Sequence, residues 1–308
     1  MAGPIVRARE FLPQLQTEPV HRVDRLRSGL LLIFVGLFKK IVVGDGLGFY
    51  LVDPAFDNPG EAGWMHLWVA IYGFTFQVYC DFSGYSDVAR GTARILGFDI
   101  PDNFNRPYAA QRLADLWQRW HITLYAWLRD YLLAALGGLR GSRARSVLNL
   151  VILFTLSGLW HGAAWTFVLW GLYHGILMSL EYLLRLRRRG QSRHEPHAAR
   201  RVLNVGLTFH LFAVSAILFR AHTVTDSGLI VQRLFSAAPA GENYIREHGL
   251  WLLLLAVVMH YGPRTRADRA SAWILRQPAV LQGAAAACAL ALLSISYTGV
   301  RPFIYFQF

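Results

Sequence analysis

Several features that soluble enzymes commonly carry are scarce or missing in this sequence of 308 residues. There are two cysteines, Cys80 and Cys288, and both lie in apolar segments, which argues against a disulfide framework and against a thiolate metal site. Neither a Gly-x-Ser-x-Gly elbow nor a Walker A loop occurs, so neither a serine hydrolase nor an ATP-driven pump is indicated. Charged residues are 16% of the chain, hydrophobic residues are 54%, and the mean hydropathy is +0.31. This balance predicts a polytopic membrane protein.

Acidic residues are also few. The chain has 19 Asp and Glu residues and 31 Lys and Arg residues, which gives a formal net charge of +12. Nucleic-acid binding is one explanation of a basic balance. Here, however, the basic residues stand in short loops between apolar runs. Signals for membrane topology and contacts with anionic lipids explain that distribution better. We therefore expect an all-α membrane protein that contacts lipids and binds no nucleic acid.

The longest apolar run, from Ser146 to Arg185, is too long for one membrane span of about 20 residues. The short element from Gly158 to Gly162 interrupts it. Arginines stand before and after the run, at Arg140, Arg143, Arg145, Arg185, Arg187, Arg188 and Arg189. Since positive residues stay on the cytoplasmic side, we predict a helical hairpin with both ends in the cytoplasm and His161 at its apex. An ionisable side chain at such depth indicates a functional site.

A structural role is the alternative for His161, with the imidazole bonded to a carbonyl freed at the helix break. His174 lies thirteen residues further on, which is no metal-ligand spacing, so we expect no metal site. Histidine titrates near neutrality and can take a proton from an attacking hydroxyl. We therefore interpret His161 as a candidate general base.

Other apolar runs predict further spans, at Trp64 to Phe82, Val202 to Phe219, Leu250 to Tyr261 and Ala279 to Tyr297. Residues 185–201 are predicted to form a basic cytoplasmic loop. The polar residues from Asp81 to Asp87 are expected directly at the end of the first of these spans. Lys39 and Lys40 interrupt an earlier apolar stretch and are expected to snorkel to the interface. A break is predicted at Gly44 to Gly46, followed by a loop that runs to Gly63.

A long helix is predicted from Ala109 to Leu136, ended by two glycines. One face is marked by residues at spacings of three and four, namely Trp117, His121, Leu124 and Leu128. Four charged residues make this segment too polar to face lipid, namely Asp115, Arg119, Arg129 and Asp130. We therefore expect it to lie in the interface or to line a cavity enclosed by protein. His121 and His161 together suggest a polar cavity with two imidazoles.

These residues belong to segments that resemble the signature of membrane-bound O-acyltransferases. The signature segments run from Asn103 to Tyr108, from Arg119 to Leu124 together with Trp127 to Tyr131, and from Ser157 to Gly162. Three further segments are similar to the branch that acetylates bacterial alginate, namely Phe38 to Lys40, Tyr79 to Asp87 and Pro302 to Phe308. The matches are spread over nearly the whole chain.

The resemblance implies tilted, re-entrant and interfacial helices around a buried chamber in a multi-pass protein of the bacterial inner membrane. It implies that His161 is catalytic and that His121 is a second functional histidine. It also implies residues that contact the substrate or donor, namely Asp81, Ser83, Asn105, Arg119, Trp120, Asp130 and Trp160. The expected reaction moves an acetyl group from a cytoplasmic thioester, acetyl-CoA or a derivative of it, to hydroxyls of an extracytoplasmic polysaccharide. No bound cofactor is expected, and the expected partners are periplasmic acetyltransferase-like proteins.

The segments Ala2 to Ile5 and Glu10 to Gln14 lie well inside family members, after several membrane helices. The resemblance therefore implies that the chain is a single membrane-embedded domain, residues 1–308, that corresponds to the C-terminal two-thirds of a family member. Three alternatives stay open. One is transfer of D-alanine or another acyl group to a cell-wall polymer. Another is a transporter, because broken helices and intramembrane polar groups suit that function too. The third is a non-catalytic scaffold of a polysaccharide-modification complex.

Overall fold

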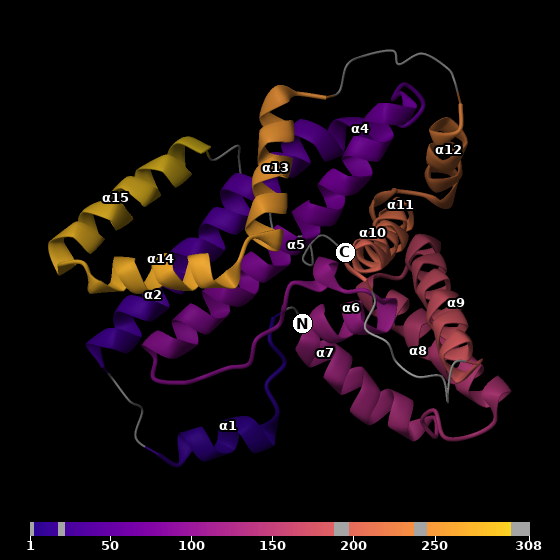
Figure 1. Cartoon of the computed structure of the whole chain (residues 1–308), viewed down its shortest axis with the longest axis horizontal. Coiled ribbons are helices and arrows are strands. Elements are labelled where there is room, and N and C mark those ends of the chain that lie inside the picture. The colour runs from indigo at the N-terminus through magenta and orange to yellow at the C-terminus, as the bar shows by residue number, and fades with distance from the viewer. Residues whose placement is uncertain (1–2, 18–21, 188–196, 237–244, 297–308) are drawn as a thin grey trace. The chain divides into compact units, whose positions relative to one another are not determined.

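The computed structural model describes residues 3–17, 22–187, 197–236 and 245–296, which form helices joined by short connections (Figure 1). Within these ranges there is no strand, and the only β-type pairing is one isolated antiparallel bridge between Phe104 and Trp120. The prediction of an all-α protein is confirmed. The predicted tail from Pro302 to Phe308 and residues 188–196 of the predicted loop lie outside the described residues.

The chain divides into two compact units. The first unit comprises Met1–Val52, Gly73–Asn103 and Ile245–Gln307, and the second comprises Asp53–Tyr72 and Phe104–Tyr244. The division falls within helix α5 (Trp64–Ile95), between Tyr72 and Gly73.

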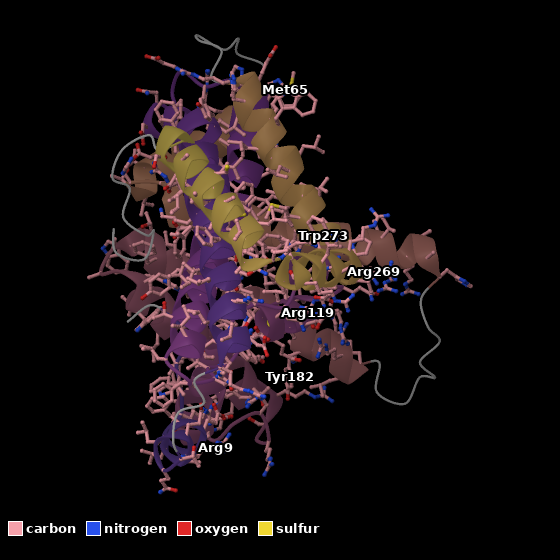
Figure 2. All side chains as sticks on the ribbon, turned by 90° about the vertical axis from the view of Figure 1, so that its left-hand side faces the viewer. Arg9, Met65, Arg119, Tyr182, Arg269 and Trp273 are labelled. Atoms are coloured by element: carbon pink, nitrogen blue, oxygen red, sulfur yellow. The ribbon has the colours of Figure 1, made fainter. Side chains whose placement is uncertain are left out.

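The first unit is built from helices at the two ends of the chain and from most of α5. They are α1 (Ala8–Leu15), α2 (Val23–Leu37), the π-helical η1 (Phe38–Gly44), α3 (Asp45–Leu47), the π-helical η2 (Gly48–Val52), α13 (Glu247–Tyr261), α14 (Arg264–Arg276) and α15 (Ala279–Ser296). The predicted break at Gly44 to Gly46 was wrong, because the chain is helical from Val23 to Asp57. The glycine instead allows a close approach, since a Cβ at Gly44 would lie 3.3 Å from the backbone nitrogen of Asp81. α14 carries exposed side chains, Arg269 and Trp273 among them (Figure 2).

The lysines of η1 do not snorkel, and that prediction was wrong. Lys40 is 5% exposed, and its Nζ lies 2.7 Å from Asp81 Oδ1 and 2.6 Å from Asp45 Oδ1. Lys39 Nζ lies 2.6 Å from Asp87 Oδ2. The carboxylates offset the cost of burying the ammonium groups. Asp81 and Asp87 therefore lie inside the 32-residue helix α5 and face η1, whereas the sequence predicted them at the end of a span.

The second unit contains the predicted hairpin. Its helices are α4 (Asp53–Asp57), the 3-10 turn η3 (Pro107–Ala109), α6 (Leu113–Arg119), α7 (Ile122–Trp127), the π-helical η4 (Leu128–Leu133), α8 (Arg143–His161), α9 (Trp165–Arg187), α10 (Ala198–Val214), α11 (Ala216–Arg220) and α12 (Val224–Leu234). α8 and α9 pack against each other along their length and run in opposite directions (Figure 1). The hairpin prediction is confirmed, while its orientation in the membrane stays a prediction.

Three described helices are long and apolar enough to cross a membrane, namely Arg143–His161, Trp165–Arg187 and the joined helix Ala198–Arg220. The last of these contains the segment predicted from Val202 to Phe219, which is helical and has the length and composition of a span. α14 and residues Ala279–Ala291 of α15 are long and apolar enough to cross a membrane only when they are taken together. The chain bends by 120° between them. α13 is apolar but shorter. The segment from Trp64 to Phe82 is helical as predicted, although α5 is not among the three, because polar residues such as His66, Gln77 and Asp81 lower its mean hydropathy.

Candidate active site

His161 is the last residue of α8, at the turn of the α8–α9 hairpin. Its helix begins at an N-cap, where Ser142 Oγ accepts a hydrogen bond from the backbone nitrogen of Arg145 at 3.2 Å. It ends where Gly162 takes an extended backbone (φ 174°), three residues before α9 begins at Trp165. Local sequence therefore positions this imidazole at the hairpin turn, as predicted.

Aromatic rings surround the half-buried imidazole of His161. Its ring centroid lies 5.1 Å from Trp160, 5.2 Å from Trp170 of α9 and 5.1 Å from Phe219 of α11, each in an edge-to-face geometry. Phe167 is slightly further away, at 6.5 Å. Rings packed edge-to-face on several sides limit the orientations that the imidazole can take. The arrangement suits a base that is held in a fixed position.

His121 lies at a break between α6 and α7 and not within one long helix, so the continuous helix predicted from Ala109 to Leu136 was wrong. Its backbone is left-handed, with φ 43°, and the residue is 3% exposed. The preceding Trp120 is extended and pairs with Phe104, while Asn105 donates its backbone N–H to the Arg119 carbonyl oxygen at 2.9 Å. A tertiary pairing has therefore replaced the helical hydrogen bonds at this point.

The break turns His121 toward the same aromatic group, because its ring centroid lies 6.3 Å from that of Trp160. Burial lowers the pKa of His121 to about 3, and the nearby His161 contributes in the same direction. His121 is therefore a neutral imidazole at physiological pH. It can accept or donate a hydrogen bond without bringing a charge into the site.

Two residues of this region have a left-handed backbone although they carry side chains. Arg106 (φ 48°) and His121 (φ 43°) are the only described residues other than glycine with positive φ. They stand on the two segments that the Phe104–Trp120 bridge holds together, where these rings also meet edge-to-face at 5.1 Å. A left-handed backbone is unfavourable for a residue that carries a side chain. It persists where the surrounding packing enforces it, often at active sites.

The other predicted contact residues of this unit have different environments. Arg119 Nε donates to Asp115 Oδ1 at 2.8 Å, and the Arg119 side chain is 33% exposed. Asp130 pairs with Arg129 at 2.7 Å on η4. Asn105 is exposed, and Trp120 is buried against Phe104. Trp160 is 42% exposed and contacts both imidazoles. The structure therefore brings Trp160, His121 and His161 together.

Asp81 and Ser83 belong to the first unit. Both are buried in α5, and Asp81 is in the ion pair with Lys40. The roles predicted for them in binding the substrate or donor stay predictions. Within the described chain there is no group of three or more His, Cys, Asp or Glu side chains placed to hold a metal ion.

The sequence did not single out Trp170 or Phe219, although both contact His161. Trp170 stands four residues before His174 on α9, so the two side chains share one helix face, and that spacing was a usable signal. Its Nε1 donates to Ser215 Oγ at 3.2 Å, which fixes the ring. Phe219 comes from a helix some 58 residues further along the chain, and no local pattern joins it to His161.

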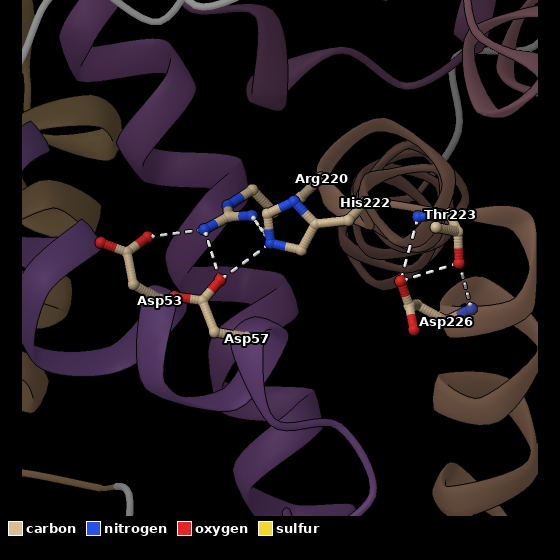
Figure 3. A network of polar contacts seen from close by, with 6 residues as sticks. All are labelled: Asp53, Asp57, Arg220, His222, Thr223 and Asp226. Carbon is tan, nitrogen blue, oxygen red and sulfur yellow. Dashed lines mark hydrogen bonds and ion pairs between the residues drawn. The ribbon is translucent and has the colours of Figure 1, made fainter.

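An ion-pair network anchors the helix that carries Phe219. Arg220 lies 2.9 Å from Asp53 Oδ1 and 3.2 Å from Asp57 Oδ1, and His222 Nε2 lies 3.0 Å from the same Asp57 oxygen (Figure 3). The next helix begins at a capping box made by Thr223 and Asp226 (Figure 3). These contacts tie the end of α11 to α4, so Phe219 is held beside His161 from outside the hairpin.

Glu181 of α9 holds the beginning of α6. Its Oε2 accepts a hydrogen bond from the backbone nitrogen of Ala114 at 3.1 Å, while its Oε1 pairs with Arg185. Ala114 is in the first turn of α6, where backbone N–H groups have no partner within the helix. Glu181 therefore caps the short helix that leads to His121.

We expect Glu181→Ala to lower the stability of the folded protein, because losing a helix cap costs about 1 kcal/mol and loosens α6. The measurement is the thermal unfolding of the protein in detergent. Arg185→Ala is the matched control, since it removes the other partner of Glu181 and leaves the bond to Ala114. Equal losses in the two variants would contradict a capping role.

The profile of the MBOAT, membrane-bound O-acyltransferase family matches residues 1–220, and the chain belongs to this family. It is 36% identical over 242 residues to the probable alginate O-acetylase AlgI of Azotobacter vinelandii, covering 77% of this chain and 45% of that protein. It is 36% identical over 236 residues to a peptidoglycan O-acetyltransferase of Helicobacter pylori, covering 74% and 42%. A teichoic acid D-alanyltransferase of Bacillus subtilis is 32% identical over 189 residues, with 58% and 47% covered. The chain thus spans less than half the length of each of these relatives.

Proposed function

We propose that this chain carries the acceptor-activating site of an O-acyltransferase that modifies an extracytoplasmic polysaccharide. The observation that carries the proposal is the convergence of His161 and His121 on Trp160, in the part of the chain that matches the family. A half-buried imidazole among aromatic rings suits a general base. A neutral His121 beside it suits hydrogen bonding to the donor or the acceptor.

The proposed step is an acyl substitution. The acceptor hydroxyl oxygen forms a bond to the carbonyl carbon of the thioester, the C–S bond breaks, and the thiolate leaves. His161 takes the proton of the hydroxyl and returns it to the departing sulfur, so the imidazole ends neutral. Trp160, which contacts both histidines and is partly exposed, is the best-supported candidate for contact with the substrates.

Acetyl is the acyl group we favour, with acetyl-CoA or a derivative of it as the thioester, because two of the relatives are described as O-acetyl-transferring proteins. The acceptor is then a polysaccharide such as alginate. D-alanyl transfer to a teichoic acid is the second candidate, and the Bacillus subtilis relative favours it. Location in the bacterial inner membrane, contact with its lipids, and handover to periplasmic acetyltransferase-like proteins form part of the same proposal.

The test is complementation of two strains, one that lacks its own polysaccharide acetylase and one that lacks its own teichoic acid D-alanyltransferase. The chain is produced alone and as a fusion behind the N-terminal segment of the Azotobacter vinelandii relative. O-acetyl and ester-linked D-alanine are then measured in purified polymer, with protein levels in the membrane as the reference. Acetyl restored by either form supports the proposal, and D-alanine restored supports the second candidate. Neither group restored, with both proteins at normal levels, would contradict acyl transfer and favour the scaffold interpretation.

A further inference from the structure

His174 is a buried histidine that has no role in the proposed reaction. It lies on α9 and is 0% exposed. Neither ring nitrogen has a hydrogen-bond partner in the described part of the chain, and the same holds for Nε1 of Trp117, which is 8% exposed. Leaving a buried polar group without a partner is unfavourable, because the group loses its hydrogen bonds to water and gains none in the protein. If packing alone determined the residue at position 174, phenylalanine would be more stable there, because its ring has no polar atom.

The rings around His174 are uncharged and come from several elements. Its ring centroid lies 5.0 Å from Trp117 of α6, 4.7 Å from Trp170 and 5.3 Å from Tyr173 of α9. Phe154 of α8 and Phe212 of α10 complete the group, at 6.2 and 5.8 Å. The two nearby side chains with other polar atoms are already engaged, because the Tyr173 hydroxyl donates to the Leu211 carbonyl oxygen and Trp170 Nε1 donates to Ser215 Oγ. The polar atoms available to each other are therefore those of His174 and Trp117.

His174 is connected to His161 through one side chain. The Trp170 ring lies 5.2 Å from His161 and 4.7 Å from His174 by ring centroids. The centroids of the two imidazoles are thus separated by no more than the sum of these two distances, with the Trp170 ring between them. Buried polar groups in proteins are commonly satisfied by ordered water, and such water is retained as part of the structure.

We propose that His174 and Nε1 of Trp117 hold an ordered water behind Trp170, and that His174 is a positioning residue that acts through His161. The water accepts from Trp117 Nε1 and donates to one ring nitrogen of His174. This places a polar, hydrogen-bonded group behind the Trp170 ring that packs on the base, within an apolar surround, where it stabilises the imidazolium that His161 becomes when it takes the hydroxyl proton. No proton is consumed, because His161 returns it to the leaving sulfur. The inference about catalysis rests on the proposed function, whereas the hydrated histidine does not.

The first experiment needs no activity. The full chain is labelled with 15N-histidine in lipid nanodiscs, and the ring nitrogens are assigned by comparison with His174→Phe. We expect a hydrogen-bonded ring nitrogen at His174 whose shift changes in Trp117→Phe. Ring nitrogens that show no hydrogen bond, or a signal that Trp117→Phe leaves unchanged, would overturn the proposal. Because this result does not depend on acyl transfer, it separates failure here from failure of the proposed function.

The second experiment measures acyl transfer against pH for the wild type, His174→Phe, His174→Gln and His210→Phe. We expect His174→Phe to lose about tenfold or more of the rate with little change in the apparent affinity for the donor, and to change the pH profile. His174→Gln, which keeps a hydrogen-bonding side chain, should recover part of the rate. His210 is the matched control, a histidine of α10 in contact with Trp68 and bonded to the Tyr72 hydroxyl outside this group.

Thermal unfolding of the same variants distinguishes a positioning role of His174 from a purely structural one. A purely structural histidine predicts that His174→Phe is at least as stable as the wild type and equally active, because two buried nitrogens are removed. The positioning role predicts that the folded protein is retained and its rate is lost. Wild-type activity in His174→Phe would overturn the positioning role. An inactive wild type would contradict the proposed function, and the 15N result would still decide whether His174 is hydrated.

Discussion

His161→Ala is expected to lower acyl transfer by about 10²–10⁴-fold, because the step then lacks the group that takes the proton from the acceptor hydroxyl. The fold should survive the change. The residue ends a helix and is half-buried, and the rings of Trp160, Trp170 and Phe219 that surround it keep their other contacts. The measurement is the acyl content of the polymer at equal membrane levels of protein, for the chain alone and for the fused form.

His210→Ala is the control for this loss, since it removes an imidazole of the same unit that packs on Trp68 and lies outside the site. It should keep most of the transfer. Acyl content that survives in His161→Ala would move the chemistry to another residue and favour a scaffold. A fall in the membrane level of His161→Ala alone would instead assign the histidine the structural role of bonding a carbonyl at the helix break.

Gly171→Ala is expected to remove most of the folded protein, because the hairpin has no space for a side chain at this position. An added Cβ at Gly171 would meet the Phe154 carbonyl oxygen and lie 2.8 Å from Thr155 Cα. Gly158 and Gly175 are under the same constraint, against the backbone at Phe167 and Val151. Since the obstructing atoms are backbone, they cannot move aside as a flexible side chain can, and overpacking of this kind costs about 1–3 kcal/mol or more.

Small residues let membrane helices approach closely, and the α8–α9 pair depends on that approach. The measurement is the level of Gly171→Ala in membranes together with its thermal unfolding in detergent. Gly206→Ala is the matched control, because Gly206 lies in α10 with nothing within 4 Å of an added Cβ. It should be neutral or slightly stabilising, as alanine favours a helix over glycine by about 1 kcal/mol. Indistinguishable behaviour of the two variants would show that α8 and α9 can separate without loss.

Family membership favours acyl transfer over the transporter alternative, but the relatives differ in both the acyl group and the acceptor. The general-base site alone does not discriminate among them, because each acceptor offers a hydroxyl to the same imidazole. The distinction therefore depends on the donor-contacting residues, and the complementation experiment measures it directly as acetyl against D-alanine.

The hairpin and its histidine were predictable from the sequence because every signal for them is local. The length of the apolar run, the glycines at its centre and the arginines at its ends all stand within some fifty residues. The segment predicted to end at Phe219 is helical and has the length and composition of a span for the same reason. His161 could be singled out since an ionisable residue in such a run needs an explanation.

The errors arose where a distant partner changed the local outcome. Lys40 was expected in the interface, yet Asp81 of α5 neutralises it in the interior, and no sequence pattern joins the two. The helix expected from Ala109 to Leu136 breaks because Trp120 pairs with Phe104 instead of continuing its helical hydrogen bonds. In both cases the deciding partner stands in another segment of the chain, outside the helix whose pattern was read.

The sequence by itself determined an all-α membrane protein of this family, with a hairpin that ends in His161. Periodicity, charge and short motifs encode these properties, and each is read within one or two helices. Only the tertiary structure decided that His121 turns toward Trp160, that Phe219 and Trp170 enclose His161, and that His174 is buried with Trp117. These neighbours come from different helices, and their distances depend on how the helices pack, which is a property of the whole chain.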